Sequence, residues 1–182
     1  MQPTALLGLE SFQDQRGNGA VGMNSEALAI GDGLTFGWSL DVDNDGEVTA
    51  LGDGLMVIRH LFGPSFQGEA LINKAISPQS PYLAKGMASA AQAVSDHIQF
   101  GIDSGLLDVD RDGYTTAFGD CLMVIRHLLK GPFQGEVLIS KAISPQSPML
   151  EGHDLNALSR TQLEDIATQV ASTIDTLIGQ DF

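Results

Sequence analysis

Basic residues, aromatic residues and cysteine are all scarce in this chain of 182 residues. Lysine and arginine together number 9, against 23 aspartates and glutamates, which gives a formal net charge of −14. This charge repels the phosphates of nucleic acids and anionic membranes, so we expect no nucleic-acid partner and a preference for cations. Because Cys121 is the only cysteine, it cannot form a disulfide within the chain, and cysteine usage does not indicate a compartment.

Long apolar runs and catalytic motifs are also missing. No apolar run approaches the ~20 residues that a membrane-spanning helix needs, so we expect no membrane insertion. The first residues lack the basic region and the apolar core of a signal peptide, which indicates either an intracellular protein or a piece of a longer one. The chain has no glycine-rich phosphate loop, no nucleophile elbow and no H-E-x-x-H motif, so we expect that it is not an enzyme.

An internal repeat organises the chain, whose hydrophobic share of 43 % is enough for a core. After a shift of 67 residues, Asp41–Leu61 matches Asp108–Leu128 at 16 of 21 positions, and Phe66–Pro81 matches Phe133–Pro148 at 14 of 16. Self-similarity of this kind predicts two copies of one structural unit. We expect the following organisation: an irregular lead-in at 1–34, a first repeat at 35–104 and a second repeat at 105–182, packed together as one domain.

Each repeat contains an aspartate-rich loop, DVDNDGEVTALGD in the first and DVDRDGYTTAFGD in the second. Three aspartates at alternate positions followed by glycine place hard oxygen donors inside a tight turn, which is the pattern of an EF-hand calcium loop. We predict two Ca²⁺ ions, with Glu47 and Tyr114 contributing backbone carbonyls and the other ligands contributing carboxylates. The predicted ligands are Asp41, Asp43, Asp45, Glu47 and Asp53 in the first loop, and Asp108, Asp110, Asp112, Tyr114 and Asp120 in the second.

These loops differ from the usual twelve-residue form. Position twelve is Gly52 or Gly119, and the closing carboxylate, Asp53 or Asp120, is at position thirteen. Two alternatives remain open for the last ligand of each ion. It is supplied either at position twelve, by Gly52 or Gly119, or at position thirteen, by Asp53 or Asp120. Aspartate is also one methylene shorter than the usual glutamate, so we expect weak affinity, towards the ~10⁻⁵ to 10⁻³ M range. A single such motif also suits a turn without metal, but its duplication favours calcium, and a flexible all-oxygen cage suits calcium better than magnesium.

The expected fold class is all-α, with two tandem EF-hand-like loop–helix repeats and additional helices packed into one compact body. Apolar residues at spacings of three and four predict a helix after each loop, ending before Gly63-Pro64 or Gly131-Pro132. A short strand pairing between the two loops is a further expectation. The other predicted helices are Glu69–Ile76 and Glu136–Ile143, each stopped by the sequence SPQSP, then Met87–Ile102, and a last helix with a capping box of Thr161 and Glu164.

Four other residues have both a functional and a structural interpretation. His60 and His127 suit a zinc pair less well than helix capping or packing between the repeats. Cys121 suits a small buried role better than a nucleophile. Trp38 suits a core anchor better than a platform for stacking a ligand.

The loop and helix of each repeat, about 45 residues in all, resemble type I dockerin modules. The stretch LGDGLMVIRHLFG is similar to dockerin-like, EF-hand-containing repeats of large cyanobacterial and marine bacterial surface proteins. Two features depart from dockerins. Dockerin loops lie closer together than 67 residues, and the Ser-Thr pair that often contacts cohesin is replaced by Ala50-Leu51 and Ala117-Phe118.

The resemblance implies calcium-dependent folding and an extracellular or cell-surface location as part of a longer protein. We therefore expect a calcium-binding structural or adhesion module. One alternative is a dockerin-type docking module of a carbohydrate-active assembly, with a cohesin-like or neighbouring domain as its partner. Another is an intracellular calcium sensor that opens an apolar groove around Met56 and Met123.

Overall fold

The computed structural model describes residues 38–179. This part of the chain is helical and has no β-strand, which confirms the all-α prediction. The expected strand pairing between the two loops is wrong, because amides within each loop donate to aspartate carboxylates of the same loop rather than to a partner strand. The predicted lead-in at 1–34 lies outside the described residues, as does the beginning of the first repeat.

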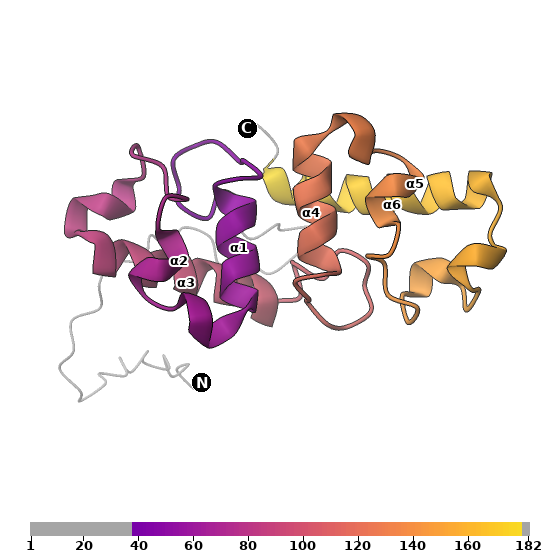
Figure 1. Cartoon of the computed structure of the whole chain (residues 1–182), viewed down its shortest axis with the longest axis horizontal. Helices are drawn as coiled ribbons and strands as arrows, with labels where there is room; N and C mark the ends of the chain where they lie inside the picture. The colour runs from indigo at the N-terminus through magenta and orange to yellow at the C-terminus, as the bar shows by residue number, and fades with distance from the viewer. Residues whose placement is uncertain (1–37, 180–182) are drawn as a thin grey trace, which may run out of the picture. The chain divides into compact units, whose positions relative to one another are not determined.

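The two repeats present their helices in the same order. Each has one helix after the loop, a short helix, and a long helix that closes the repeat (Figure 1). The first repeat contains α1 (Asp53–Leu61), α2 (Glu69–Ile72) and α3 (Met87–Asp103), and the second contains α4 (Asp120–Leu129), α5 (Glu136–Ile139) and α6 (Arg160–Ile178). Short 3₁₀ turns connect them at Gly63–Phe66, Pro81–Lys85, Gly131–Phe133, Pro148–Leu150 and Leu155–Ala157.

Helices α1 and α4 form as predicted, directly after the loops. Each has an aspartate in its first turn and an arginine and a histidine in its last turn, which suits the helix dipole at both ends. The two helices pack against each other and run in opposite directions (Figure 1). Gly54 makes this close approach possible, because a Cβ there would lie 2.9 Å from Cγ1 of Ile125.

Helices α2 and α5 are shorter than predicted. The first was expected to reach Ile76 but ends at Ile72, because Lys74 takes a left-handed conformation with φ of 58°. The Arg59 guanidinium donates to the Leu71 carbonyl at 3.0 Å, so an acceptor that a longer helix would use is already occupied. The second repeat differs from its prediction in the same way, with α5 ending at Ile139, Lys141 at φ of 56° and Arg126 donating to the Leu138 carbonyl.

The long helices carry the apolar stripes predicted from the sequence. Helix α3 ends one residue later than expected. The capping box of α6 is formed by Ser159 and Gln162, so the predicted pair of Thr161 and Glu164 is wrong. The reason is that α6 begins earlier, at Arg160, which places Thr161 inside the helix.

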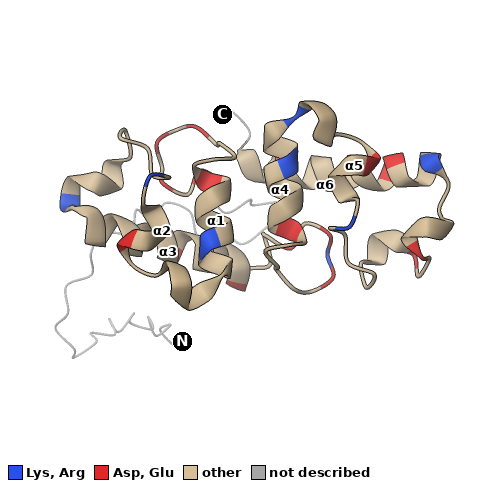
Figure 2. Ribbon diagram, in the orientation of Figure 1, with Lys and Arg blue, Asp and Glu red and all other residues tan. Residues whose placement is uncertain are grey.

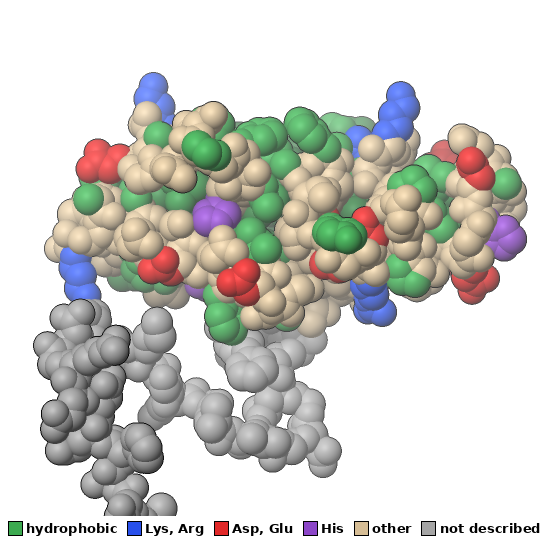
Figure 3. All heavy atoms as spheres, turned by 90° about the horizontal axis from the view of Figure 1, so that it is seen from below, with side chains coloured by type: hydrophobic (Ala, Val, Ile, Leu, Met, Phe, Trp, Pro, Cys, Tyr) green, Lys and Arg blue, Asp and Glu red, His purple; other side chains and the backbone are tan. Residues whose placement is uncertain are grey.

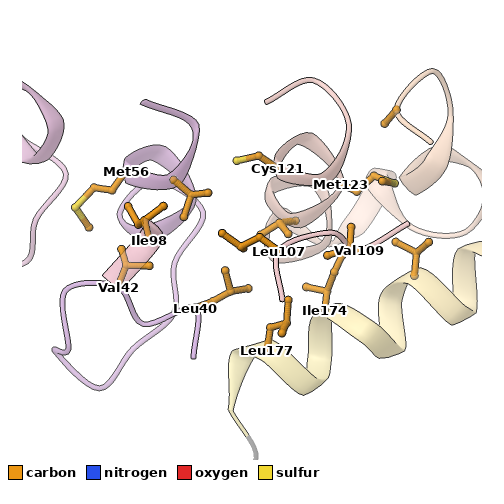
Figure 4. Close-up of a cluster of buried hydrophobic side chains, with 14 of the residues drawn as sticks. Leu40, Val42, Met56, Ile98, Leu107, Val109, Cys121, Met123, Ile174 and Leu177 are labelled. Carbon is orange, nitrogen blue, oxygen red and sulfur yellow. The ribbon is translucent and has the colours of Figure 1, made fainter. Parts of the chain in front are cut away.

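One hydrophobic core joins the two repeats. Leu40 and Leu107 directly precede the two loops, Val42 and Val109 lie within them, and these four residues alternate with the aspartates and are at most 1 % exposed. Figure 4 shows Leu40 and Leu107 near Leu177 of α6, and Val109 near Ile174 of the same helix. The backbone here consists of turns and bends rather than a strand, and its irregular path places the apolar side chains in the core. Each loop therefore directs its apolar residues inward while its carboxylates gather on the other side.

Candidate metal centre

Acidic residues lie along both loops and at the first turn of α1 and α4 (Figure 2). In the first loop, Asp41, Asp43 and Asp45 each offer one oxygen, and these oxygens lie within 4.8 Å of one another. In the second loop, the same holds for Asp108, Asp110 and Asp120. Like charges at this distance repel one another, so each group is an arrangement that could hold a metal ion.

Backbone amides hold the carboxylates of the first loop in place. Asp41 accepts hydrogen bonds from the amides of Asp45 at 3.0 Å and of Gly46 at 2.8 Å, and Asp45 accepts one from Glu47 at 2.9 Å. Gly46 allows this turn because its φ of 92° is strained for any residue with a Cβ. The second loop repeats the pattern, with Asp108 accepting from Asp112 at 3.0 Å and from Gly113 at 2.8 Å, and Asp112 accepting from Tyr114 at 2.9 Å.

Asp53 connects the first turn of α1 to both sides of the loop. Its Oδ1 accepts from the amide of Val42 at 2.9 Å and its Oδ2 from the amide of Thr49 at 2.8 Å. Gly52 leaves room for this contact, because a Cβ there would lie 2.5 Å from the Thr49 hydroxyl oxygen. Asp120 makes the equivalent contacts with Val109 at 2.9 Å and Thr116 at 2.8 Å, and Gly119 has the same close neighbour in Thr116.

Both of these closing aspartates are only 2 % exposed. Burial raises the pKa of Asp53 to about 6, an effect that the amides of Thr49 and Val42 oppose and the charge of Asp43 reinforces. Burial likewise raises the pKa of Asp120 to about 6. A raised carboxyl pKa means that the negative charge lacks compensation in its surroundings. A bound cation would supply that compensation.

Asp43 lies at the centre of the first group. Its side chain is 2 % exposed, its Oδ2 accepts from the amide of Ser77 at 2.6 Å, and its Oδ1 has no hydrogen-bond partner. Burial raises the pKa of Asp43, and the charges of Asp45 and Asp41 raise it further. A buried carboxylate oxygen without a partner is costly. It fits a cation, because a metal ion would supply the missing interaction.

Asp110 is the counterpart of Asp43 in the second repeat. It too is 2 % exposed, and burial raises its pKa, as do the charges of Asp112 and Asp108. Its Oδ1 accepts from the amide of Asp112 at 3.2 Å, which is the long end of the usual range. The second loop thus offers a similar buried carboxylate, except that its Oδ1 accepts one long hydrogen bond whereas Oδ1 of Asp43 accepts none.

The remaining predicted ligands do not belong to the two groups of converging oxygens. Glu47 and Tyr114 have exposed side chains, and Tyr114 is 73 % exposed. The contributions of their carbonyls stay predictions. Asp53 lies outside the first group of converging oxygens, and Asp112 lies outside the second.

Sequence analysis missed the serines of the two SPQSP segments. Ser77 and Ser80 contact Asp43, and Ser144 and Ser147 contact Asp110. These contacts span 34 and 37 residues, a separation that no local motif covers. The signal available in the sequence was the identity of SPQSP in both repeats, at the same distance from the loop.

The two histidines each contact the long helix of their own repeat. His60 bonds Gln99 of α3 at 3.1 Å, and His127 bonds Asp175 of α6 at 2.7 Å. Their packing is thus within each repeat, whereas the sequence left helix capping and packing between the repeats open as alternatives to a zinc pair.

Cys121 lies in the hydrophobic core, and Trp38 packs against it. Cys121 is 2 % exposed, and burial raises the pKa of its thiol to about 12, so it is a poor nucleophile at neutral pH. Trp38 donates to the His97 carbonyl at 2.9 Å and stacks on the His97 ring. It also contacts Gly101 on the same helix. Both residues thus pack as the structural interpretation predicted.

Comparison of the chain with models of known protein families, with curated proteins and with solved structures finds no match. The interpretation of the site therefore depends on the chemistry of its own residues. Two groups of convergent carboxylates can hold metal ions. Among the described helices, none has the length and apolar character required to cross a membrane.

Proposed function

We propose that this chain is a calcium-binding structural module, with two EF-hand-like loops whose ions stabilise the fold. The observation that carries the proposal is the buried Oδ1 of Asp43, which has no hydrogen-bond partner and belongs to a group of three converging carboxylates. A cation satisfies such an oxygen and also reduces the repulsion among its neighbours. The duplicate arrangement around Asp110 supports a second ion.

Calcium suits these donors better than other common ions do. The donors are carboxylates on a short irregular loop, with no nitrogen or sulfur ligand in either group. Calcium takes six to eight oxygens in flexible geometry, whereas magnesium demands a near-ideal octahedron and zinc favours nitrogen and sulfur. A closing aspartate at position thirteen favours weak sites, which the millimolar calcium outside cells would fill. We accordingly propose an extracellular or cell-surface location within a longer protein.

The test is calorimetric titration of the chelator-treated protein with calcium. We expect two sites in the unmodified chain, one site in Asp43→Asn or in Asp110→Asn, and none in the double variant. Asp165→Asn, on an exposed position of α6, is the matched control and should keep both sites. Absence of calcium uptake at millimolar concentration, or a thermal melt that chelator leaves unchanged, would overturn the proposal.

A second candidate function is a dockerin-type protein-docking module. The observation that favours it is a pair of exposed apolar side chains at equivalent loop positions, Leu51 at 74 % and Phe118 at 70 % exposure. Phe118 lies 5.6 Å from the ring of Phe62, so aromatic surface is continuous there. The face drawn in Figure 3 shows hydrophobic side chains scattered among polar ones.

The docking test is calcium-dependent capture of a cohesin-like or neighbouring domain by the unmodified chain and by Leu51→Ser and Phe118→Ser variants. Loss of capture in the variants with unchanged calcium uptake would support docking, and equal capture by all three proteins would count against it. The sensor alternative requires α1 and α4 to expose Met56 and Met123, which are both 0 % exposed. A dye for apolar surface that responds to calcium would favour it.

A further inference from the structure

The SPQSP segment of each repeat contacts the aspartate at the third position of its loop twice. In the first repeat, the amide of Ser77 donates to Asp43 Oδ2 at 2.6 Å, and the hydroxyl of Ser80 donates to the Asp43 carbonyl at 2.5 Å. In the second, the amide of Ser144 and the hydroxyl of Ser147 make the same contacts with Asp110 at 2.6 and 2.5 Å. The pairing thus holds both the side chain and the backbone of one metal-site aspartate.

The serine hydroxyls are buried and rigidly placed. Ser80 is 4 % exposed and Ser147 is 2 % exposed, which is rare for serine unless its hydroxyl is bonded. In the first repeat, Pro78 and Pro81 flank the hydroxyl, and the amide of Ser80 closes the turn on the Ser77 carbonyl at 3.1 Å. Because the two prolines restrict the backbone φ, the segment loses little conformational entropy when it folds against the loop.

These contacts divide the two oxygens of Asp43 between two roles. The Ser77 amide occupies Oδ2, while Oδ1 has no hydrogen-bond partner and belongs to the group of converging carboxylates. Without the serine turn, the side chain of Asp43 could rotate and its backbone could shift. The turn therefore determines which oxygen faces the other two aspartates.

We infer that the SPQSP turn is the second half of each metal site, and that Ser80 and Ser147 are positioning residues that set the cation affinity of their own loop. The inference rests on the proposed function, since it concerns the same two sites. The SPQSP turn also connects the metal site to the short helix that precedes it, α2 or α5. Arg59 holds that segment through the carbonyls of Leu71 and Asn73, at 3.0 and 2.8 Å. Cation binding should consequently order residues 69–85 as well as the loop.

A serine that only stabilises the fold would behave differently from a positioning serine. Loss of a purely structural hydroxyl lowers the melting temperature and leaves the two affinities in their original ratio. Loss of a positioning hydroxyl weakens the site of its own repeat and spares the other. Groups that orient metal ligands typically change affinity by ~10- to 100-fold when removed.

The two tyrosines of the chain allow each site to be followed separately. Tyr82 lies close to the first group, since burial raises its pKa and the charges of Asp41 and Asp43 raise it further. Tyr114 belongs to the second loop. Terbium, a trivalent ion that occupies calcium sites, emits when a nearby tyrosine is excited. The variants Tyr82→Phe and Tyr114→Phe would assign the two luminescence signals.

The experiment is terbium titration, with calcium competition, of the full chain carrying Ser80→Ala or Ser147→Ala. We expect Ser80→Ala to weaken the first site about 10-fold or more and to leave the second unchanged, with the mirror result for Ser147→Ala. Ser80→Thr keeps the hydroxyl and should restore affinity. Ser77→Ala is the matched control, because the Ser77 side chain bonds only Gln79 and its amide is retained.

The possible outcomes separate the inference from the function on which it rests. Equal weakening of both sites, or unchanged affinities with a lower melting temperature, would overturn the inference and leave calcium binding intact. Absence of terbium luminescence and of calcium uptake in the unmodified chain would overturn the proposed function, and the inference with it. Because Ser80 and Ser147 are tested independently, failure of one variant to fold still leaves the other as a decisive measurement.

Discussion

The backbone amide of Leu40 donates a hydrogen bond of 2.7 Å to the carbonyl of Leu177. Leu40 immediately precedes the first metal loop, whereas Leu177 belongs to the last turn of α6. Both side chains are buried in the common core, at 0 % and 7 % exposure. The beginning of one repeat is therefore held by the end of the other, and the two repeats are expected to unfold together.

This arrangement predicts one cooperative transition. Trp38 fluorescence reports on the first repeat and reactivity of the buried Cys121 thiol reports on the second, so their denaturation curves should coincide. Leu177→Ala should lower the free energy of unfolding by about 2 to 4 kcal/mol through the cavity it leaves. Thr176→Ala, on the exposed side of the same helix, is the control and should change stability by at most about 0.5 kcal/mol. Two separate transitions would contradict the prediction.

Removal of calcium should make Cys121 reactive. The thiol is buried against α1, with its Sγ 3.6 Å from the Gly54 carbonyl, and its raised pKa keeps it protonated at neutral pH. A thiol reagent at pH 8 should react slowly in millimolar calcium and much faster after chelation, because opening of the contact between α1 and α4 exposes the sulfur. Equal rates with and without chelator would show that calcium does not hold this contact.

Gly101→Ala should disturb the anchoring of Trp38. A Cβ at Gly101 would lie 2.4 Å from Trp38 Cζ2, which forces the indole to move. We expect a loss of about 1 to 3 kcal/mol from overpacking, partly offset by the better helix propensity of alanine. The tryptophan emission should shift towards the red as the ring becomes more exposed. Ser89→Ala, at an exposed position of α3, is the control and should leave both stability and emission unchanged.

Arg59→Ala should destabilise the first repeat. The guanidinium donates to two backbone carbonyls, those of Leu71 and Asn73. Hydrogen bonds from a charged group are worth about 1.5 to 3 kcal/mol, so we expect a loss of about 2 to 3 kcal/mol in chemical denaturation. Arg160→Ala is the control, because that side chain is 79 % exposed and its ion pair with Glu164 contributes about 0.5 kcal/mol or less. Equal effects of the two substitutions would contradict this role.

The metal-free protein should be more stable at pH 5 than at pH 7. Burial raises the pKa of Asp53 and of Asp120 to about 6, above the ordinary value of roughly 3.9 in the unfolded chain. The folded state therefore binds more protons between these values, and the free energy of unfolding falls as pH rises through about 6. We expect a difference of order 1 to 3 kcal/mol in chelator. A flatter profile in Asp53→Asn,Asp120→Asn would assign the effect, whereas an identical profile would refute the assignment.

The residues that the sequence placed well share one property, which is that their positions follow from local spacing. Helices α1, α3, α4 and α6 carry apolar residues at helical spacing and are followed within two residues by glycine, and the structure contains all four. In the first loop the three aspartates at alternate positions converge, and in the second Asp108 and Asp110 converge with the closing Asp120. Trp38 and Cys121 pack into the core, as their apolar character suggested.

The predictions that failed depended on contacts between distant parts of the chain. Helix α2 ends early where Lys74 takes a left-handed conformation, and Arg59 of α1 binds the carbonyls of Leu71 and Asn73 in the segment around this end. The sequence left several roles open for the histidines, and the packing of α1 and α4 against the long helices of their own repeats decided among them. The capping box of α6 is a local exception, since it lies two residues earlier than predicted and involves only neighbouring residues.

The sequence by itself determined the repeat, the helical class and the aspartates that make up each candidate metal centre, since periodicity and turn chemistry act over a few residues. Only the tertiary structure decided that a serine turn 34 residues downstream holds the central aspartate of each loop. It also decided that Leu40 and Leu177 join the repeats into one body. Such contacts depend on how the helices pack, and packing brings together residues whose relationship no local pattern encodes.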